Sequence, residues 1–580
     1  MRDYTGKRRN MKHALVIGAL FAASTLWAAS ANAAQSDAEL ILYNGNIRTP
    51  GGAVKALAVD GKGLIVALGD LDEVAPSVSG KAQRIDLSGA TVLPGFHDLH
   101  VHPWYAGLRE SDVLKNVCRF KQGSSLETVQ ARIKECVEKA KPGEWITGGR
   151  WDAPALGGVP NRKLLDEVAP DNPIFLDDTS GHSGWSNTKA LEVAGLTKDT
   201  PDPDDGIIER DTDGTPTGVL RETAQNIVRK HIPTPTRDEH RDVVAWSLEK
   251  MLSYGITSFT EAAGSPEAAQ AYQDLADNGT LKQRVRFCTR WTPGNEAAEK
   301  IISNRNFYAR ERLSFDCVKI VLDGVPTDSH TAAMVEPYGS KMEGRDDEAA
   351  RKGMLLVKQD TLNKAVARFD KMGLGMKIHS AGDAAVRASL DAIEYARHQN
   401  GYSGVLHDVA HCTFVHKKDI GRARDLGATF EVSPYLWGPT PINDSITAAI
   451  GDKRIERVWP VREMLDAGQP VVAGSDWSVV PSVNPWIGVE TLVSRRAPGG
   501  GEKTFGANEA ISIEQAIDLF TVNAARHERM QDKLGVIGVG MIADLVVLDA
   551  DPYTTKTEDL HNTKVLKTII NGEIVYEGAK

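Results

Sequence analysis

Cysteine is scarce in this sequence, and basic charge does not dominate it. The chain has 580 residues and only 5 cysteines, no two of which form a Cys-x-x-Cys pair. This scarcity argues against a small disulfide-scaffold protein, and the missing pair argues against a thiolate zinc site. The formal net charge of −10 excludes nucleic acid and an anionic membrane surface as the main partner, because either would favour a basic face.

Long apolar runs are also absent, apart from a short one near the N-terminus. Residues 7–33, KRRNMKHALVIGALFAASTLWAASANA, combine a basic start, an apolar middle and a small-x-small end. The apolar part is short for a membrane span, which needs about 20 apolar residues. The pattern predicts a signal peptide over residues 1–33, a periplasmic or secreted protein, and no stable membrane insertion. A retained anchor is the alternative, and Arg8-Arg9 leaves the Sec and twin-arginine routes open.

If the protein is exported, its few cysteines can form disulfides. In an oxidising compartment Cys118 and Cys136 could form a disulfide, and the sequence leaves this open against two buried thiols. Cys288, Cys317 and Cys412 each lie in a predicted strand. We expect these three to pack as small apolar side chains.

The two ends of the chain share a pattern of short β-type runs separated by glycine turns. ELILYNGNIRTP and KALAVDGKGLIVALG follow the predicted signal, and ADLVVLDADP and VLKTIINGEIVYEG lie near the C-terminus. Each end is too small to bury a core of its own. We therefore expect residues 34–90 and 535–580 to pair into one small β-domain.

Between these ends the pattern changes to alternating strands and helices. The candidate strands are ATVLPGFHDLHVH, GITSFTEA, QRVRFCTR, FDCVKIVLDG, GLGMKIHSAG, LHDVAHCT, GATFEVSP and QPVVAGSDW. Helical stretches separate most of them, for example 236–253, 361–372 and 383–399. Eight strands alternating with helices predict a (β/α)8 barrel over residues 91–534. An open doubly wound sheet is the alternative, but no Gly-rich phosphate loop follows the first strand.

A long segment after the first barrel strand does not fit this alternation. Residues 103–235 are rich in Gly, Pro and Asp and are predicted to be an insertion over the active-site face. Within it, His182, Trp185 and Asn187 are candidates to line a substrate pocket, as is Trp104 just after the first strand. For each of them, a structural role in a folded lid is the alternative.

The first barrel strand carries histidines at alternating positions. In LPGFHDLHVHP, the residues Asp98, His100 and His102 share one face of the strand, whereas His97 faces the other way. At the carboxyl end of a barrel strand, two imidazoles at this spacing point into one cavity. We expect His97 to be a packing or surface residue and Asp98 to orient a ligand.

Later strands end in the same kind of side chain. His379 ends the fifth predicted strand, His411 the sixth and Asp476 the eighth. Barrel enzymes hold catalytic groups at these strand ends. Neutral imidazoles with a carboxylate form a site for a first-row metal, and Zn2+ is the default for this set of N and O donors. The pattern therefore predicts a metal centre at the barrel mouth.

Lys319 shares an inward face with Asp323 near the end of the fourth predicted strand. An ammonium would be repelled by a divalent cation and has no lone pair to donate. Two interpretations follow. The lysine is neutral and carboxylated on nitrogen, so that an anionic carbamate bridges two metals, or it turns away and pairs with Asp323. The first requires a depressed pKa, which burial near positive charge would supply.

Several of these motifs resemble those of a known group of enzymes. LPGFHDLHVHP, VKIVLDG, KIHSAGDAAV, VAHCTFV and AGSDWSVVPSVNPW are similar to the amidohydrolase superfamily, specifically its amidohydrolase-3 branch, which includes N-substituted formamide deformylases. SGHSGWSNTKALEVAGLT and PTGVLRE resemble the insertion of that branch. The resemblance spans nearly the whole mature chain. It implies an α/β fold, a (β/α)8 TIM barrel with a small composite β-sandwich domain formed by the N- and C-terminal segments.

The resemblance also implies roles for single residues. The metal ligands it implies are His100, His102, Lys319, His379, His411 and Asp476. Asp476 would also be the catalytic residue that accepts the proton of a metal-activated water, whose pKa falls from about 15.7 towards 7 on a divalent ion. One or two divalent ions, Zn2+ by default, are expected, with Lys319 N-carboxylated if two bind.

The expected activity is hydrolysis of a carbon–nitrogen bond other than a peptide bond. The substrate would be a small-molecule N-substituted amide, and the reaction its deacylation or deformylation. The alternatives are a deaminase or lactonase of the same superfamily, or an exported, non-enzymatic metal-binding regulatory protein. The sequence leaves open whether the chain forms a homodimer.

Overall fold

The computed structural model describes residues 39–121, 123–178, 183–203, 206–327, 329–341, 346–437 and 441–578. The predicted signal peptide and His182 lie outside these residues. Within the described ranges, no helix is long and apolar enough to cross a membrane.

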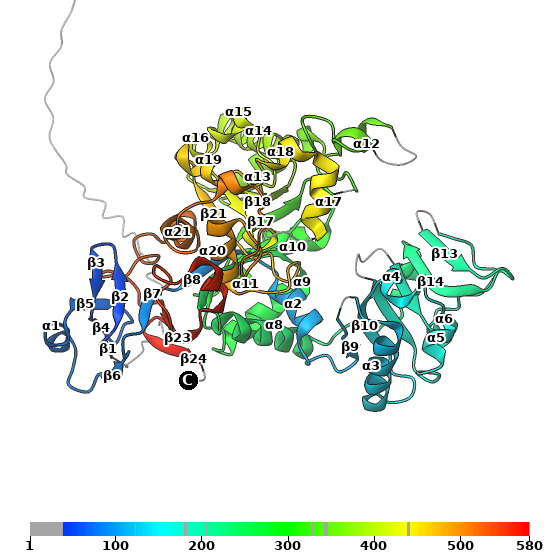
Figure 1. Cartoon of the computed structure of the whole chain (residues 1–580), viewed down its shortest axis with the longest axis horizontal. Helices are drawn as coiled ribbons and strands as arrows, with labels where there is room; N and C mark the ends of the chain where they lie inside the picture. Colours follow the sequence, from blue (N-terminus) through cyan, green and yellow to red (C-terminus); the bar gives the residue numbers. More distant parts are fainter. Residues whose placement is uncertain are drawn as a thin grey trace, which may run out of the picture. The chain divides into compact units, whose positions relative to one another are not determined.

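Eight strands form the central sheet, in the order β21-β20-β19-β18-β17-β16-β15-β8. They are β8 (Phe96–Val101), β15 (Ile256–Gly264), β16 (Arg284–Arg290), β17 (Leu313–Val321), β18 (Gly375–Ser380), β19 (His407–His411), β20 (Ala428–Val432) and β21 (Val471–Ala473). Figure 1 labels β8, β17, β18 and β21 of this sheet. Every hydrogen-bonded pair among the eight strands is parallel. All eight predicted strands are present in the predicted order.

The sheet closes on itself between its last and first strands. The amide of Asp476 donates to the carbonyl of His100 (2.7 Å), and the amide of His102 donates to the carbonyl of Trp477 (2.6 Å). Gly474 permits this approach, because a Cβ at that position would lie 2.4 Å from the backbone nitrogen of His100. The closed parallel sheet with helices between its strands is the predicted TIM barrel.

Helices follow the barrel strands where the periodicity predicts them. Helices α8 (Arg237–Leu252), α13 (Gln359–Lys371) and α14 (Asp383–Asn400) match the three predicted stretches. A capping box between Thr236 and Glu239 begins α8. Further helices of the barrel are α2 (Pro103–Glu110), α9 (Pro266–Asp277), α10 (Glu296–Ser303), α17 (Pro441–Ile450), α20 (Pro485–Ser494), α21 (Ile513–Phe520) and α22 (Val522–His527).

Strands from both ends of the chain form a second sheet, in the order β24-β23-β22-β7-β2-β3. Its members are β2 (Asn46–Thr49), β3 (Gly52–Val54), β7 (Thr91–Pro94), β22 (Leu545–Leu548), β23 (Val565–Ile570) and β24 (Glu573–Glu577). A further sheet contains β1 (Leu40–Tyr43), β4 (Ala56–Val59), β5 (Ile65–Gly69) and β6 (Gln83–Asp86). Leu40 and Leu57 of this sheet share one buried cluster with Val92, Leu545 and Ile569 of the composite sheet. This is the predicted composite β-sandwich.

The first predicted barrel strand is divided between two sheets. β7 pairs with β22 of the composite sheet, whereas β8 pairs with β15 of the barrel. Gly95 lies between them, where a Cβ would lie 2.3 Å from the hydroxyl oxygen of Thr257. The barrel therefore begins at Phe96 rather than at residue 91.

The segment between β8 and α8 contains its own sheet, β13-β14-β12-β11-β10-β9. Its strands are β9 (Val117–Cys118), β10 (Ile146–Trp151), β11 (Ile174–Asp178), β12 (Ser183–Ser186), β13 (Gly206–Arg210) and β14 (Pro216–Glu222). Helix α3 (Leu126–Lys139) contributes Val129 and Ile133 to a buried cluster with Trp151 and Leu176. That this insertion covers the active-site face stays a prediction.

The structure contains two disulfides. Cys118 is bonded to Cys136, which settles the pairing that the sequence left open. Cys288 is bonded to Cys317, so the expectation that these two pack as separate apolar side chains is wrong. They stand opposite each other in the register of β16 and β17, which strand sequences alone do not reveal. Cys412 is a buried free thiol, as predicted.

Candidate metal centre

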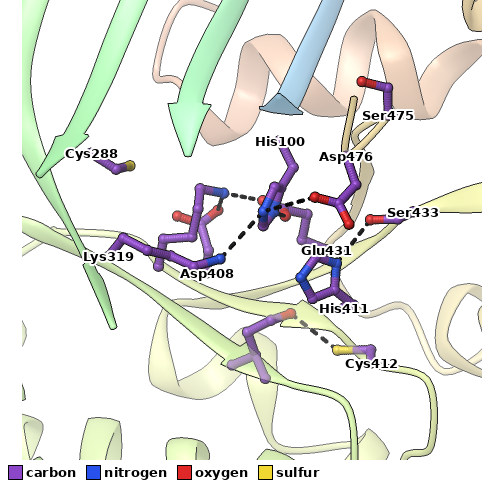
Figure 2. Close-up of polar contacts among 12 residues, drawn as sticks. His100, Cys288, Lys319, Asp408, His411, Cys412, Glu431, Ser433, Ser475 and Asp476 are labelled. Atoms are coloured by element: carbon purple, nitrogen blue, oxygen red, sulfur yellow. Dashed lines mark hydrogen bonds and ion pairs between the residues drawn. The ribbon is translucent and has the colours of Figure 1, made fainter. Parts of the chain in front are cut away.

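The carboxyl ends of the barrel strands bring His100, His411 and Asp476 together (Figure 2). One ligand atom of each lies within 4.8 Å of those of the other two. Nε2 of His100 is 3.7 Å from Oδ1 of Asp476, and the rings of His100 and His411 are 4.5 Å apart between centroids. Three of the six predicted ligands thus form a cluster with the dimensions of a metal site.

Two further predicted ligands flank this cluster. Nε2 of His102 is 3.2 Å from Oδ1 of Asp476. The ring of His379 lies 4.8 Å from that of His411. Asp476 has a left-handed backbone with a φ of 61°, a conformation that Asp tolerates better than most residues. The Asp476 carboxylate is therefore within reach of imidazoles from both ends of the His-x-His motif.

Lys319, the sixth predicted ligand, is buried beside the cluster, and its Nζ lies 3.3 Å from Nε2 of His100. Burial, together with the charge of Lys377, lowers the pKa of Lys319 to about 8. The alternative in which Lys319 pairs with Asp323 is wrong. The Asp323 carboxylate contacts other groups: Nδ1 of His379 (3.0 Å) and the amides of Ala333, Ala381 and Gly382.

Each of the four histidines has an oxygen near its Nδ1. The partners are Glu431 for His100, Asp323 for His379 (3.0 Å), Ser433 for His411 (3.0 Å) and Glu261 for His102 (3.7 Å). An imidazole that donates its Nδ1–H to such an oxygen keeps the lone pair of Nε2 free for a metal. The carboxylates beside His100 and His379 thus favour the tautomer of these two histidines that leaves Nε2 free.

The charge states of His100, His411 and Asp476 suit a divalent cation, whereas the carboxylates of Asp476 and Glu261 outweigh burial and raise the pKa of His102. Burial lowers the pKa of His100 and of His411 well below the ordinary value, so both are neutral near pH 7. Burial alone would raise the pKa of Asp476, but His411 and His102 outweigh it and lower the pKa. Neutral imidazoles with an ionised carboxylate are the donor set of a first-row metal. The residues present fit such an ion.

Two predicted substrate contacts are wrong. Trp185 is fully buried in the core of the insertion, with its ring 6.2 Å from that of Trp151. Asn187 is the N-cap of α6 (Thr188–Val193), and its side-chain oxygen also accepts from the amide of Ile174. Both side chains are structural, because their environments are filled by the insertion itself.

The remaining residues of the first strand and its surroundings have assigned partners. The indole of Trp104 donates to Nδ1 of His240 on α8 (3.1 Å), and its predicted contact with substrate stays a prediction. His97 is buried and pairs through Nδ1 with Glu528 (2.6 Å). Asp98 accepts from the amides of Ser475 and His100, so it holds the two strand ends together.

The sequence analysis did not identify the charged residues that lie behind the predicted ligands. Glu261 is 1 % exposed, and Lys377 and Glu431 are 0 % exposed. Each is the one charged residue of its predicted strand, in GITSFTEA, GLGMKIHSAG and GATFEVSP respectively. A lone charge in a strand that is buried on both faces has to be paired or lie at a site, and this signal could have identified them.

Residues 83–576 match the sequence profile of the Amidohydrolase family. The chain belongs to this family. The predicted family is thereby confirmed, and the amidohydrolase is a hydrolytic enzyme. An N-substituted formamide deformylase of Arthrobacter pascens is 28 % identical over 563 residues, which cover 93 % of this chain and 98 % of the relative. A putative amidohydrolase, YtcJ, of Bacillus subtilis (strain 168) is 26 % identical over 523 residues, which cover 86 % of this chain and 91 % of the relative.

Solved structures give the same fold for the amidohydrolase. An uncharacterized metal-dependent hydrolase from Pyrococcus horikoshii OT3 superposes with a TM-score of 0.71 at 25 % identity, covering 90 % of this chain and 99 % of that one. A second such hydrolase, from Pyrococcus furiosus, has a TM-score of 0.68 at 24 % identity and covers 89 % of this chain and 100 % of that one.

Proposed function

We propose that this amidohydrolase hydrolyses the carbon–nitrogen bond of a small N-substituted amide, by deformylation or deacylation, with one or two divalent metal ions. The donor set favours zinc. The observation that carries the proposal is the convergence of four imidazoles, with His100 and His411 neutral, and one ionised carboxylate at the strand ends. The residues that would hold the metal are His100, His102, His379, His411 and Asp476. The similarity to an N-substituted formamide deformylase supports the choice of bond.

The chain itself supplies a proton acceptor at the reaction centre. When bound, a divalent metal polarises a carbonyl oxygen and lowers the pKa of water, so that a nucleophile is available near neutral pH. Asp476 has a lowered pKa, and its carboxylate is therefore ionised and able to accept a proton from the attacking water. It then delivers that proton to the leaving nitrogen as the carbon–nitrogen bond breaks.

Lys319 supports a centre with two metals. With a pKa of about 8, a usable fraction of its amine is neutral near pH 7 to 8. The neutral amine attacks CO2, a carbon–nitrogen bond forms, and one proton leaves to solvent. The carbamate replaces a cation by an anion with two oxygen donors beside His100. This change removes the repulsion that an ammonium 3.3 Å from a ligand nitrogen would exert on a metal ion.

The two disulfides support the proposal that the enzyme is exported. Cys118–Cys136 and Cys288–Cys317 are both bonded. Disulfides persist in the periplasm and outside the cell and are rare in the cytosol. Together with the predicted signal peptide over residues 1–33, they favour a periplasmic or secreted enzyme.

A metal count combined with a substrate panel tests the proposal. Protein lacking residues 1–33 is loaded with Zn2+, and the ions per chain are measured by mass spectrometry. Hydrolysis is assayed on N-substituted formamides, N-acyl amines, aminated heterocycles and lactones. We expect one or two ions per chain and turnover of at least one of these amides. Turnover confined to aminated heterocycles or to lactones would contradict amide hydrolysis and favour a deaminase or a lactonase.

A further inference from the structure

The barrel interior behind the metal ligands contains buried charges where aliphatic side chains are usual. Lys377 of β18, Asp408 of β19 and Glu431 of β20 are each 0 % exposed. Nζ of Lys377 contacts Oε2 of Glu431 and lies 3.5 Å from Oδ1 of Asp408. Since β18, β19 and β20 are neighbours in the sheet, these charges form one network across three strands.

This network reaches a predicted metal ligand through Glu431. Oε1 of Glu431 contacts Nδ1 of His100, and Figure 2 shows these two side chains next to each other. Oε2 of Glu431 contacts Nζ of Lys377. The two oxygens of one carboxylate are therefore divided between an imidazole and an ammonium. The position of the Glu431 carboxylate therefore sets the direction in which Nε2 of the His100 ring points.

Asp408, at the end of the network away from His100, also has charged partners. Asp408 pairs with Arg286 (3.3 Å) and with Nε2 of His527 (2.8 Å). Nδ1 of His527 contacts the hydroxyl of Thr429 (3.0 Å). Lys377 thus lies between Asp408, which has other charged partners, and Glu431, which contacts His100.

We propose that Lys377 is a positioning residue of the metal centre. Its ammonium holds the Glu431 carboxylate against the Nδ1–H of His100, and this aims the Nε2 lone pair of His100 at the metal. Stability alone does not account for the arrangement, because apolar residues often replace a buried ion pair without loss. An apolar pair would leave His100 Nδ1 without this acceptor. The inference rests on the proposed metal centre.

Two variants separate positioning from simple charge compensation. Lys377→Met keeps the stem and removes the ammonium, which leaves Glu431 as an uncompensated buried charge. We expect zinc affinity to fall 10- to 100-fold, the usual effect of losing a group that orients a ligand, together with a lower thermal midpoint. In Lys377→Met/Glu431→Gln the buried charge is gone, so the thermal midpoint recovers. Zinc affinity stays low, because a neutral amide is a weaker acceptor for the imidazole.

Arg397→Met is the matched control. Arg397 forms a buried pair with Asp370, which also contacts Nε2 of His407 at the amino end of β19, away from His411. This variant should lower the thermal midpoint and leave zinc affinity unchanged. Affinity is measured by competition with a chromophoric chelator, and the midpoint by circular dichroism.

The outcomes distinguish the two proposals. Lower zinc affinity in Lys377→Met, where Glu431 is intact, supports positioning by Lys377. Wild-type zinc affinity with a lowered midpoint in Lys377→Met would overturn it, since Lys377 would then only compensate a charge. A wild-type protein that binds no zinc in the same assay would overturn the proposed metal centre itself, and this inference with it.

Discussion

At the residue scale, the Asp476 carboxylate lies 3.2 Å from Nε2 of His102 and 3.7 Å from Nε2 of His100. Asp476→Asn preserves the size of the side chain but removes the proton acceptor. We expect kcat for amide hydrolysis to fall by about 10²- to 10⁴-fold, the usual contribution of a general acid–base. Metal content, measured by mass spectrometry, should stay largely intact because the histidines remain. Activity close to that of the wild type would contradict the role of Asp476.

Asp98 gives stability a pH dependence. Burial raises its pKa from 3.8 to about 7, although the amide of Ser475 donates to Oδ1 (2.9 Å). Oδ2 is buried and has no hydrogen-bond partner among the described residues. Between pH 3.8 and about 7 the folded state holds a proton that the unfolded state has released. The contribution of this proton to stability is therefore fully present below this window and is lost as the pH rises through 7.

Asp98→Asn should remove this dependence. The amide oxygen still accepts from the Ser475 amide, and no charge is buried at high pH. We expect the variant to be more stable than the wild type at pH 8, by about 1 to 4 kcal/mol, with little difference at pH 4. Urea unfolding at both pH values measures this. An equal difference at the two pH values would show that Asp98 does not titrate in this window.

Strand parity explains which site residues could be predicted from the sequence. It places His100 and His102 on one face, and the strand ends place His379, His411 and Asp476 at one barrel mouth. Parity cannot identify which residue lies behind a ligand. Glu431 is 331 positions from His100 along the chain, and only the closure of the barrel brings the two together.

At the scale of elements, one disulfide ties β9 to α3 within the insertion. Cys118 and Cys136 are 18 positions apart, and closing a loop of this length stabilises a fold by about 3 kcal/mol. Cys118→Ala/Cys136→Ala should destabilise the insertion by about this amount. Hydrogen exchange of the α3 amides measures the loss. Reductant should produce the same change in the wild type and no further change in α3 of the variant; unchanged exchange in both would contradict the prediction.

Sequence patterns predicted most of the barrel elements but neither the boundary between β7 and β8 nor the second disulfide. Apolar runs predicted the eight strands, and the 3.6-residue period predicted α8, α13 and α14, which are long enough to show it. The apolar pattern joined β7 and β8 into one strand, because only Gly95 separates the end of β7 from the start of β8. Pairing of Cys288 with Cys317 depends on the register of β16 against β17, and a slip by one residue would point the two side chains apart.

At the scale of the whole molecule, the proposed ligands come from strands that are far apart in the sequence. β8 provides His100 and is followed by His102, β18 and β19 provide His379 and His411, and Asp476 follows β21. A metal that binds them in the folded state alone stabilises the barrel as a unit. At 100 times its dissociation constant, the free ion adds about 2.7 kcal/mol.

Removing the metal should therefore change both stability and activity. We expect dialysis against a chelator to lower Tm by about 2 °C and to abolish amide hydrolysis, and Zn2+ to restore both. In Asp476→Asn, Zn2+ should restore Tm but not hydrolysis, since the ion still binds while the proton acceptor is missing. Scanning calorimetry and the amine-release assay on the same samples separate the two effects. Hydrolysis that survives complete removal of metal would contradict the metal centre, because Asp476 alone has nothing to polarise the amide carbonyl.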